Sequence, residues 1–449
     1  MKNVLLGAAS VLALSIAAPA LAQSTSTVTQ SNTGNLTTVN QVASPTGASS
    51  NVNQSGATNV TNVTQQDDGS GSNPVNVSDV SQSGDNNSAV VAQNASTFAL
   101  QNNSTVDQTG DGNSADVTQL DDGQTSLVAQ SSDNNSALVQ QGDATAALTD
   151  TSWGNFSAIS QSGSGGHVAE VSQTERFNDS MIDQSGDAGE AYVAQSGQSN
   201  GSSISQTGTD DDAFVTQSGN GNGSSILQDG TNVLATVLQS GDGNRSAIDQ
   251  TSPGGVRPLD SAVLVDQSGD NNTSDVFQRA NQGYAQVLQG GTDSDATILN
   301  YGNRSVAYVS QLSGDDNSAT ITQRGEDSDA LVYQTGSRNT GTIDQQEDSP
   351  PTENFSAAIF QSGDDNVSSI AQDGDNSLAI NEQGGDLNTS TISQTGSTHY
   401  AGVGQYGDGN LSLVTQSGTS NSALVLQLTD GNSSTVTQSG TLNAAFVSQ

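Results

Sequence analysis

Glutamine recurs at intervals of 11 residues along most of this chain. Two runs are unbroken, and their members are Gln173, Gln184, Gln195, Gln206, Gln217, Gln228, Gln239 and Gln250, then Gln361, Gln372, Gln383, Gln394, Gln405, Gln416, Gln427, Gln438 and Gln449. Between the runs the interval continues with small shifts, and residues 30–161 show the same unit with more interruptions. A fixed interval repeated this often indicates an architecture in which each unit packs on its neighbours.

Each 11-residue unit alternates inward and outward residue types before its glutamine. Ala or Ser lies four positions before the glutamine and Val or Ile lies two positions before it, as Ala191 and Val193 do before Gln195. Alternation with a period of two predicts a strand with one buried face. The residues that follow each glutamine are turn formers, for example residues 83–86 after Gln82, where glycine allows a positive φ. Each unit is therefore predicted to be one strand followed by one turn.

The full repeat is 22 residues long, because two kinds of unit alternate. Before Gln184 the inward pair is Ser180 and Ile182, whereas before the next glutamine it is Ala191 and Val193. If each coil of the chain contains two strands, units of the same kind lie next to each other in space, although units of different kinds follow each other in the sequence. We therefore predict an all-β fold, a β-solenoid with two strands per coil of about 22 residues. Its coils would stack at about 4.8 Å and give two parallel sheets with their inner faces in contact.

Asparagine is common six positions before the glutamine, and both amides face inward in this arrangement. We expect each kind of amide to stack on its own kind, each side-chain amide donating to the next carbonyl along the axis, so that the buried amides keep their partners. Carboxylates are nearly absent from the inward positions between residues 173 and 250, where only Asp211 is acidic. The predicted core amide ladder comprises Gln184, Gln195, Gln206, Gln217, Gln228, Gln239, Gln250, Asn178, Asn200, Asn222 and Asn244.

The first residues are typical of a secretory signal. Residues 1–3 carry one positive charge, residues 4–18 are almost wholly apolar, and residues 20–22 fit an A-x-A cleavage site. We predict a signal peptide over 1–22, interrupted repeats over 23–161 and regular repeats over 162–449, the last two continuous as one elongated domain. No later stretch approaches the roughly 18 consecutive apolar residues of a spanning helix, so we expect no membrane span.

The chain is strongly acidic, with a formal net charge of −39 and only 8 Lys+Arg. Because nucleic-acid binding requires clusters of cations, we expect no nucleic-acid partner. The absence of Cys excludes disulfides and thiolate metal sites. Recurrent aspartates in the turns are expected to keep the chain soluble and to oppose lateral clumping. These turn residues are Asp85, Asp111, Asp187, Asp242, Asp270, Asp364 and Asp408.

Residues that could perform catalysis are scarce. The two histidines, His167 and His399, are too few and too far apart in the chain to suggest a metal pair, and we expect them at surface positions near turns. Exposed turn carboxylates lack the burial that shifts a pKa toward acid–base chemistry. We therefore predict no enzyme, no cofactor, and no catalytic or metal site.

The spacing Q-x-G-x-x-N-x-A-x-x-x-Q resembles the curlin repeat of curli fibre subunits. Gln82, Gly84, Asn87, Ala89 and Gln93 meet it, and three further segments, residues 108–119, 416–427 and 438–449, meet it as well. The resemblance implies a secreted bacterial subunit that polymerises into amyloid fibres at the cell surface, for adhesion and biofilm matrix. It also implies two partners, a nucleating subunit and an outer-membrane export pore.

A stack of coils ends in an edge whose backbone groups are unpaired, and such an edge can template the addition of another chain. The repeat continues through Asn443, Ala445, Val447 and Gln449, and we expect this C-terminal assembly edge to dock on the first coils of a second molecule. The alternative function is that of a monomeric acidic extracellular β-solenoid that binds Ca²⁺ or a glycan on its surface. Fibres of the purified chain would favour assembly, and persistent monomers would favour the alternative.

Overall fold

In the computed structural model the chain divides into two compact units, Met1–Gly221 and Asn222–Gln449. The structure describes residues 24–42, 47–67, 76–95, 101–142, 154–251, 257–346 and 354–449. The expected signal peptide at 1–22 lies outside these residues. Every helix or strand assigned in the described residues is a β-strand, which confirms the all-β prediction. This part of the chain has no helix long and apolar enough to cross a membrane.

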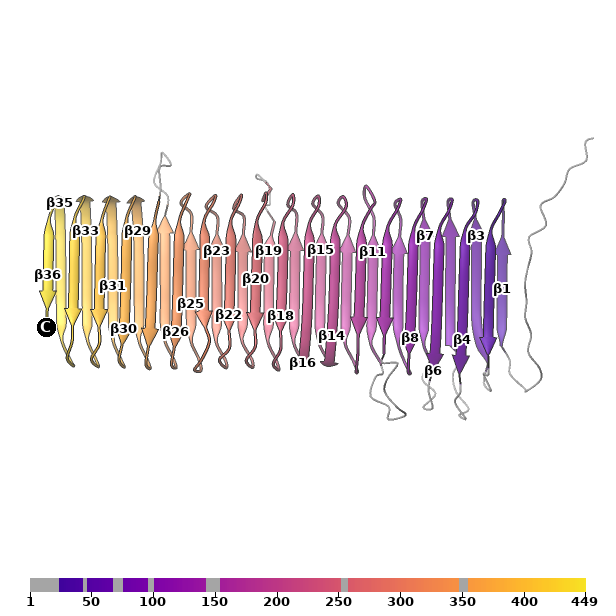
Figure 1. Ribbon diagram of the computed structural model, residues 1–449, viewed down its shortest axis with the longest axis horizontal. Coiled ribbons are helices and arrows are strands. Elements are labelled where there is room, and N and C mark those ends of the chain that lie inside the picture. The colour runs from indigo at the N-terminus through magenta and orange to yellow at the C-terminus, as the bar shows by residue number, and fades with distance from the viewer. Residues whose placement is uncertain are drawn as a thin grey trace, which may run out of the picture. The chain divides into compact units, whose positions relative to one another are not determined.

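In the first unit, successive strands alternate between two parallel sheets, one of odd-numbered and one of even-numbered strands (Figure 1). The odd sheet contains β1 (Thr25–Gln30), β3 (Ala48–Ser55), β5 (Asn76–Ser83), β7 (Asn103–Thr109), β9 (Thr125–Gln130), β11 (Phe156–Gln161), β13 (Asp179–Gln184) and β15 (Gly201–Gln206). The even sheet contains β2 (Leu36–Val42), β4 (Val60–Asp67), β6 (Ser88–Ala95), β8 (Ser114–Leu120), β10 (Ser136–Gln141), β12 (Val168–Gln173), β14 (Glu190–Gln198) and β16 (Asp212–Asn220).

The second unit has the same organisation. Its odd sheet contains β17 (Gly223–Gln228), β19 (Arg245–Gln250), β21 (Thr273–Gln278), β23 (Asp295–Asn300), β25 (Ser318–Gln323), β27 (Thr340–Gln346), β29 (Val367–Asp375), β31 (Thr389–Ser397), β33 (Leu411–Thr419) and β35 (Ser433–Thr441). Its even sheet contains β18 (Leu234–Gln239), β20 (Ala262–Gln267), β22 (Tyr284–Gln289), β24 (Val306–Gln311), β26 (Asp329–Thr335), β28 (Ser356–Ser362), β30 (Leu378–Gly384), β32 (Tyr400–Gln405), β34 (Ser422–Gln427) and β36 (Ala444–Ser448).

Each strand pairs in parallel with the strand two places later in the chain, so that equivalent repeat positions lie side by side. In the pairing of β13 with β15, Ile182 lies opposite Ile204 and Gln184 lies opposite Gln206. One coil of the chain thus contributes one strand to each sheet. This register confirms the predicted β-solenoid with two strands per coil and two parallel sheets.

The core of each unit lies between its two sheets and is built from the alternating inward residues. Ser180 and Ile182 of β13 and Ala191 of β14 are fully buried, and Val193 is 2% exposed. The small residue lets the facing sheets approach closely, and the β-branched residue fills the remaining width. The sequence therefore needs few large side chains to exclude water from this core.

Stacked turns explain the glycine that follows many strands. Gly84 has a φ of 100°, which favours glycine, and a Cβ added there would lie 2.2 Å from the carbonyl oxygen of Gly110 in the next coil. A larger residue would therefore push adjacent turns apart. Close stacking of the turns brings the side chains of successive turns within hydrogen-bonding distance.

Candidate assembly site

A column of buried glutamines runs along each sheet of each unit. Gln195 Nε2 donates to Gln217 Oε1 in the next strand of the same sheet at 2.8 Å. The same Nε2 also donates to the backbone oxygen of Asp179 at 3.0 Å. Because Asp179 begins β13 in the opposite sheet, one amide group links successive coils and also ties the two sheets together.

The structure places all the predicted glutamines in these columns, each at most 2% exposed. Within the first unit Gln184 donates to Gln206 at 2.8 Å. Within the second, Gln228 donates to Gln250 at 3.0 Å and Gln239 donates to Gln267 at 2.7 Å. The bond from Gln250 to Gln278 is longer, at 3.5 Å. Every one of these bonds runs from the earlier strand to the later strand.

The asparagines are buried as expected, but the prediction that they bond amide to amide is wrong. Asn178 Oδ1 accepts the backbone N–H of Asn200 at 3.1 Å, and its Nδ2 donates to the backbone oxygens of Thr174 and Gly197 at 2.7 and 2.9 Å. The side chain is one methylene shorter than glutamine and lies where the turn enters the strand. There it meets backbone groups that the sheet leaves unpaired.

The other predicted asparagines bond in the same way. Asn200 Nδ2 donates to the Gly219 oxygen at 2.9 Å, and Asn222 Nδ2 donates to the Gly241 oxygen at 2.7 Å. Asn222 Oδ1 accepts the backbone N–H of Asn244 at 2.9 Å. The asparagine columns therefore fasten turn to turn, whereas the glutamine columns fasten side chain to side chain.

Both histidines are buried, so the expectation of surface positions is wrong. His167 is 1% exposed and His399 is 2% exposed. Each occupies the position six residues before a glutamine, where asparagine is common. His167 Nδ1 accepts the Gly189 N–H at 3.1 Å, and its Nε2 lies 2.8 Å from the Ser162 oxygen, to which the Nε2–H donates. The imidazole thus supplies one acceptor and one donor, as the asparagine amide does.

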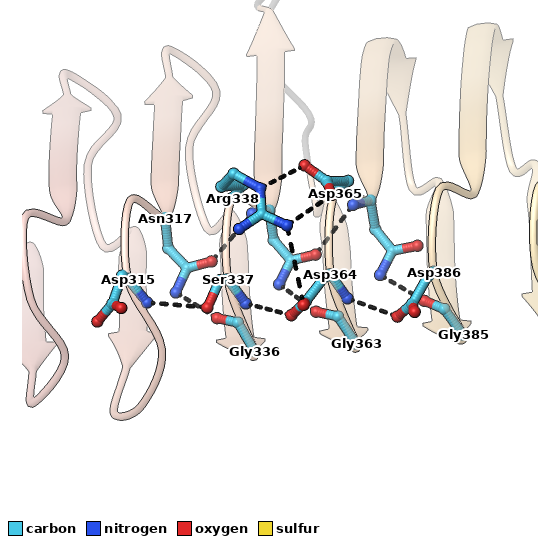
Figure 2. Close-up of polar contacts among 12 residues, drawn as sticks. Asp315, Asn317, Gly336, Ser337, Arg338, Gly363, Asp364, Asp365, Gly385 and Asp386 are labelled. Carbon is cyan, nitrogen blue, oxygen red and sulfur yellow. Dashed lines mark hydrogen bonds and ion pairs between the residues drawn. The ribbon is translucent and has the colours of Figure 1, made fainter.

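The turn aspartates form a third kind of column, which was not predicted from the sequence. Figure 2 shows it in the second unit, where the Ser337 N–H donates to Asp364 Oδ1 and the Asp364 N–H donates to Asp386 Oδ1, both at 2.8 Å. In the first unit the Asp85 N–H donates to Asp111 Oδ1 at 2.7 Å. At Asp187 the backbone N–H donates instead to the Gly208 oxygen. Aspartate recurring eight residues before the glutamine was the signal in the sequence.

Arginines neutralise part of this acidic surface. Arg338 contacts Asp365 through two hydrogen bonds of 2.7 Å, and its guanidinium lies 3.8 Å from Asp364 (Figure 2). The hydrogen bond to Arg338 lowers the pKa of Asp365 below its ordinary value. Arg304 lowers the pKa of Asp327 in the same way. These pairs are exposed, so they make only small contributions to stability.

The predicted C-terminal assembly edge is open in the structure. Among the described residues β36 pairs with β34 alone, and Asn443 and Gln449 are exposed. Ala445 and Val447 are half-exposed, although Ala423 and Val425, one coil earlier, are fully buried. Asn443 Nδ2 donates to the Asn421 side chain at 2.9 Å, an amide-to-amide bond of the kind that was predicted for asparagine.

Among the described residues, the first and the last coils differ in hydrogen-bonding character, because the glutamine-to-glutamine bonds named here all point from the earlier strand to the later one. In the first coil Gln30 and Gln41 donate to the next glutamines at 2.6 and 2.9 Å, and their own Oε1 atoms accept no bond from the described residues. In the last coil Gln438 and Gln449 accept at Oε1, while their Nε2 atoms donate to backbone oxygens and to no side chain of the described residues. One edge therefore presents side-chain acceptors and the other presents side-chain donors.

The described residues contain no group of three or more His, Cys, Asp or Glu side chains that could hold a metal ion. The glutamine columns can form hydrogen bonds that all point in one direction along the stack of coils.

Comparison with protein families identifies the repeat. The family model of the curlin associated repeat matches residues 178–208, 291–325, 385–418 and 407–440. The first match spans β13 to β15 and the last spans β33 to β35, so the matched segments carry the amide columns. Comparison with curated proteins found no match. The resemblance predicted from the spacing of the repeats is confirmed.

Proposed function

We propose that this chain, which its curlin associated repeats and its β-solenoid fold identify as a curlin-like structural protein, is secreted and assembles end to end into amyloid-like fibres. The fibres would lie at the cell surface and serve adhesion and the biofilm matrix. A nucleating subunit and an outer-membrane export pore are the partners that the family resemblance implies. No catalytic role is part of the proposal, because the family is structural.

The opposite polarity of the two open edges carries this proposal. The donors Gln438 Nε2 and Gln449 Nε2 at one edge match the acceptors Gln30 Oε1 and Gln41 Oε1 at the other. A second molecule that docks in the same orientation would continue both glutamine columns without a break. The opposite orientation would bring donors against donors. Growth is therefore expected to be directional.

Docking would also bury apolar surface at the C-terminal edge. Ala445 and Val447 would become as buried as Ala423 and Val425 already are. The backbone N–H and C=O groups of β35 and β36 would gain the second neighbour that every interior strand within a unit has. Hydrogen bonds and burial thus favour the same geometry.

The test replaces the two edge glutamines with leucine, which is similar in size to glutamine but has no hydrogen-bond donor. The double variant Gln438→Leu and Gln449→Leu lacks both donors, and Gln140→Leu with Gln346→Leu is the matched control, since both of those glutamines are exposed. At about 1 kcal/mol per lost hydrogen bond, seeded elongation should slow by roughly tenfold or more in the edge variant. The control should elongate like the unmodified chain.

Thioflavin fluorescence and electron microscopy of the chain lacking residues 1–22 would give the elongation rates. Equal rates for the edge variant and the control would contradict docking through these amides. If the unmodified chain stayed monomeric and bound Ca²⁺ or a glycan, the alternative function would replace fibre assembly.

A further inference from the structure

The two sheets of the second unit present very different outer surfaces. Most outward residues of its even strands are aliphatic or aromatic. We call the outward side chains of the even strands β18 to β36 the apolar face. Tyr308, Tyr333, Phe360, Tyr400 and Leu424 on this face are each 37–39% exposed. These side chains are large and in contact with water, although the core of the unit is already complete beneath them.

The odd sheet of the same unit is the internal comparison. Ser and Thr hold about half of its outward positions, as Thr320 and Thr322 do in β25 and Thr389 and Thr391 do in β31, and large apolar residues hold fewer of them than on the even sheet. Both sheets have the same strand type, the same register and the same buried core. The apolar residues of the even sheet are therefore not needed to form the strands, and their position on one side indicates a separate use for that side.

Charge on the apolar face is confined to its margins. Its acids are Asp266 and Glu382 at the last outward position of their strands and Asp329 at the first. The central outward positions carry no charged residue, and they include Leu264, Leu331, Ile380, Leu424 and Phe446. An apolar centre with a charged rim is the pattern of a protein interface.

Glycines make part of the apolar face flat. A Cβ added to Gly402 would lie 3.3 Å from the Tyr400 hydroxyl, and one added to Gly404 would lie 3.1 Å from the Tyr406 ring. The two rings therefore lie over the glycines of β32 and cover its backbone. Nearby, Tyr333 and Phe360 have ring centroids 6.4 Å apart and line a hollow of about 360 Å³ with Glu382. A flat surface that carries a shallow hollow suits another sheet better than it suits a flexible chain.

The size of the apolar face matches a stable dimer. Ten strands at about 4.8 Å span about 45 Å, and three outward residues across each strand span about 20 Å with their side chains. The face therefore offers on the order of 900 Å² per molecule, near the roughly 800 Å² per partner of a standard protein interface.

We propose that the apolar face is a lateral interface through which two copies of this chain pack sheet against sheet. A second copy fits because the same apolar pattern repeats at every coil, so that the face is complementary to itself under a two-fold axis. A polysaccharide fits less well, because the central positions offer few hydrogen-bonding groups. An anionic lipid surface fits less well still, because no outward position of these even strands is Lys or Arg. The pairing is sideways and does not depend on end-to-end growth.

The test compares equal substitutions on the two faces of the second unit. The triple variant Leu331→Thr, Ile380→Thr and Leu424→Thr alters the centre of the apolar face with a residue that favours strands. The matched control is Val367→Thr, Leu411→Thr and Leu413→Thr, three exposed residues on the odd sheet. Both variants also carry Gln438→Leu and Gln449→Leu, which are expected to slow end-to-end growth, so that sideways pairing can be measured before the chain elongates. Circular dichroism establishes that each variant keeps its strands.

Sedimentation velocity over a range of concentrations gives the dissociation constant. The parent is the chain that carries only the two edge substitutions. The control should form dimers with the same dissociation constant as the parent. The dissociation constant of the apolar-face variant should be at least 100-fold higher. A label-free check uses the absence of Cys in the chain: Leu331→Cys should form disulfide-linked dimers on mild oxidation, and Leu413→Cys should not. Equal dimerisation of both triple variants would overturn the proposal. So would a parent that remains monomeric, or one that is retained by polysaccharide through the apolar face.

Discussion

The glutamine column and the aspartate column repeat with the same interval but lie in opposite environments. The interior glutamines are buried in both units, and an amide such as that of Gln195 or Gln267 accepts from the preceding glutamine and donates to the next. The turn aspartates are exposed or half-exposed, and carboxylates such as those of Asp111 and Asp386 accept a backbone N–H at the surface. Loss of a buried partner costs the full desolvation of the group left behind, whereas water replaces an exposed partner. We therefore expect each glutamine to contribute more to the free energy of unfolding than each aspartate, although both columns repeat with the same interval.

The two units show that the aspartate column is also more variable. In the first unit it lies in turns that enter even strands, as Asp85 does before β6, whereas in the second it lies in turns that enter odd strands, as Asp364 does before β29. The glutamine columns lie in both sheets of both units. Burial fixes the position of the glutamines in the repeat. The exposed aspartates lie before even strands in one unit and before odd strands in the other, and the fold is the same in both.

The largest expected effect comes from two adjacent glutamines in β10. Gln141 is buried, donates to Gln173 at 2.9 Å and accepts from Gln119 at 3.0 Å, whereas Gln140 is exposed. Gln141→Ala leaves two buried groups without partners and should lower the free energy of unfolding by about 3 kcal/mol. Gln140→Ala should change it by less than about 0.5 kcal/mol. If urea titrations gave the two variants equal losses of unfolding free energy, the distinction between buried and exposed glutamines would be contradicted.

A buried histidine sharpens the comparison, because it replaces an asparagine within a column. His167→Asn should keep the stability of the parent, since the amide can accept and donate at the same places. His167→Ala should lower the free energy of unfolding by about 1–2 kcal/mol, because the Gly189 N–H loses its acceptor. Thermal unfolding of the two variants measures this. A tolerated Ala with a destabilising Asn would contradict the assigned role.

A smaller effect is expected in the aspartate column. Asp364→Ala removes the acceptor for the Ser337 N–H and should cost about 0.5–1 kcal/mol, whereas Asp364→Asn keeps an acceptor and should cost less than about 0.3 kcal/mol. Chemical unfolding at low and high salt measures both. A loss as large as that of Gln141→Ala would show that the exposed column is as important as the buried one.

The smallest effect is a dependence on pH. Burial raises the pKa of Asp266 and Asp329 above the ordinary value of 3.8. Ionisation of these groups therefore costs folding free energy at neutral pH, and this cost disappears as the pH falls through their raised pKa. Asp327 and Asp365, whose pKa values are lowered, lose their contribution only at still lower pH.

The control for this pH dependence is the double variant Asp266→Asn and Asp329→Asn. Between about pH 6 and pH 4 the parent should gain more unfolding free energy than the double variant does. Identical slopes for the two proteins would contradict the assignment, whatever other groups titrate in that range.

The fold could be predicted from the sequence because one interval sets both the strand length and the register. The glutamine spacing located the strands, and the alternation of Ser180 with Ala191 indicated two sheets. The partners of the asparagines could not be predicted in the same way, since spacing shows which residues stack but not whether an amide reaches a side chain or the backbone. His167 was misplaced because its residue type was given more weight than its position in the repeat. The apolar face lies at outward positions, whose residue types do not set the strand length or the register, so the features that predict the fold do not reveal it.

X-ray diffraction from aligned fibres of the chain lacking residues 1–22 tests the central claim most directly. Stacked coils predict a sharp meridional reflection at about 4.7–4.8 Å, the spacing between hydrogen-bonded strands along the fibre axis. A soluble chain without β-structure, or aggregates whose diffraction lacks that meridional reflection, would contradict the account.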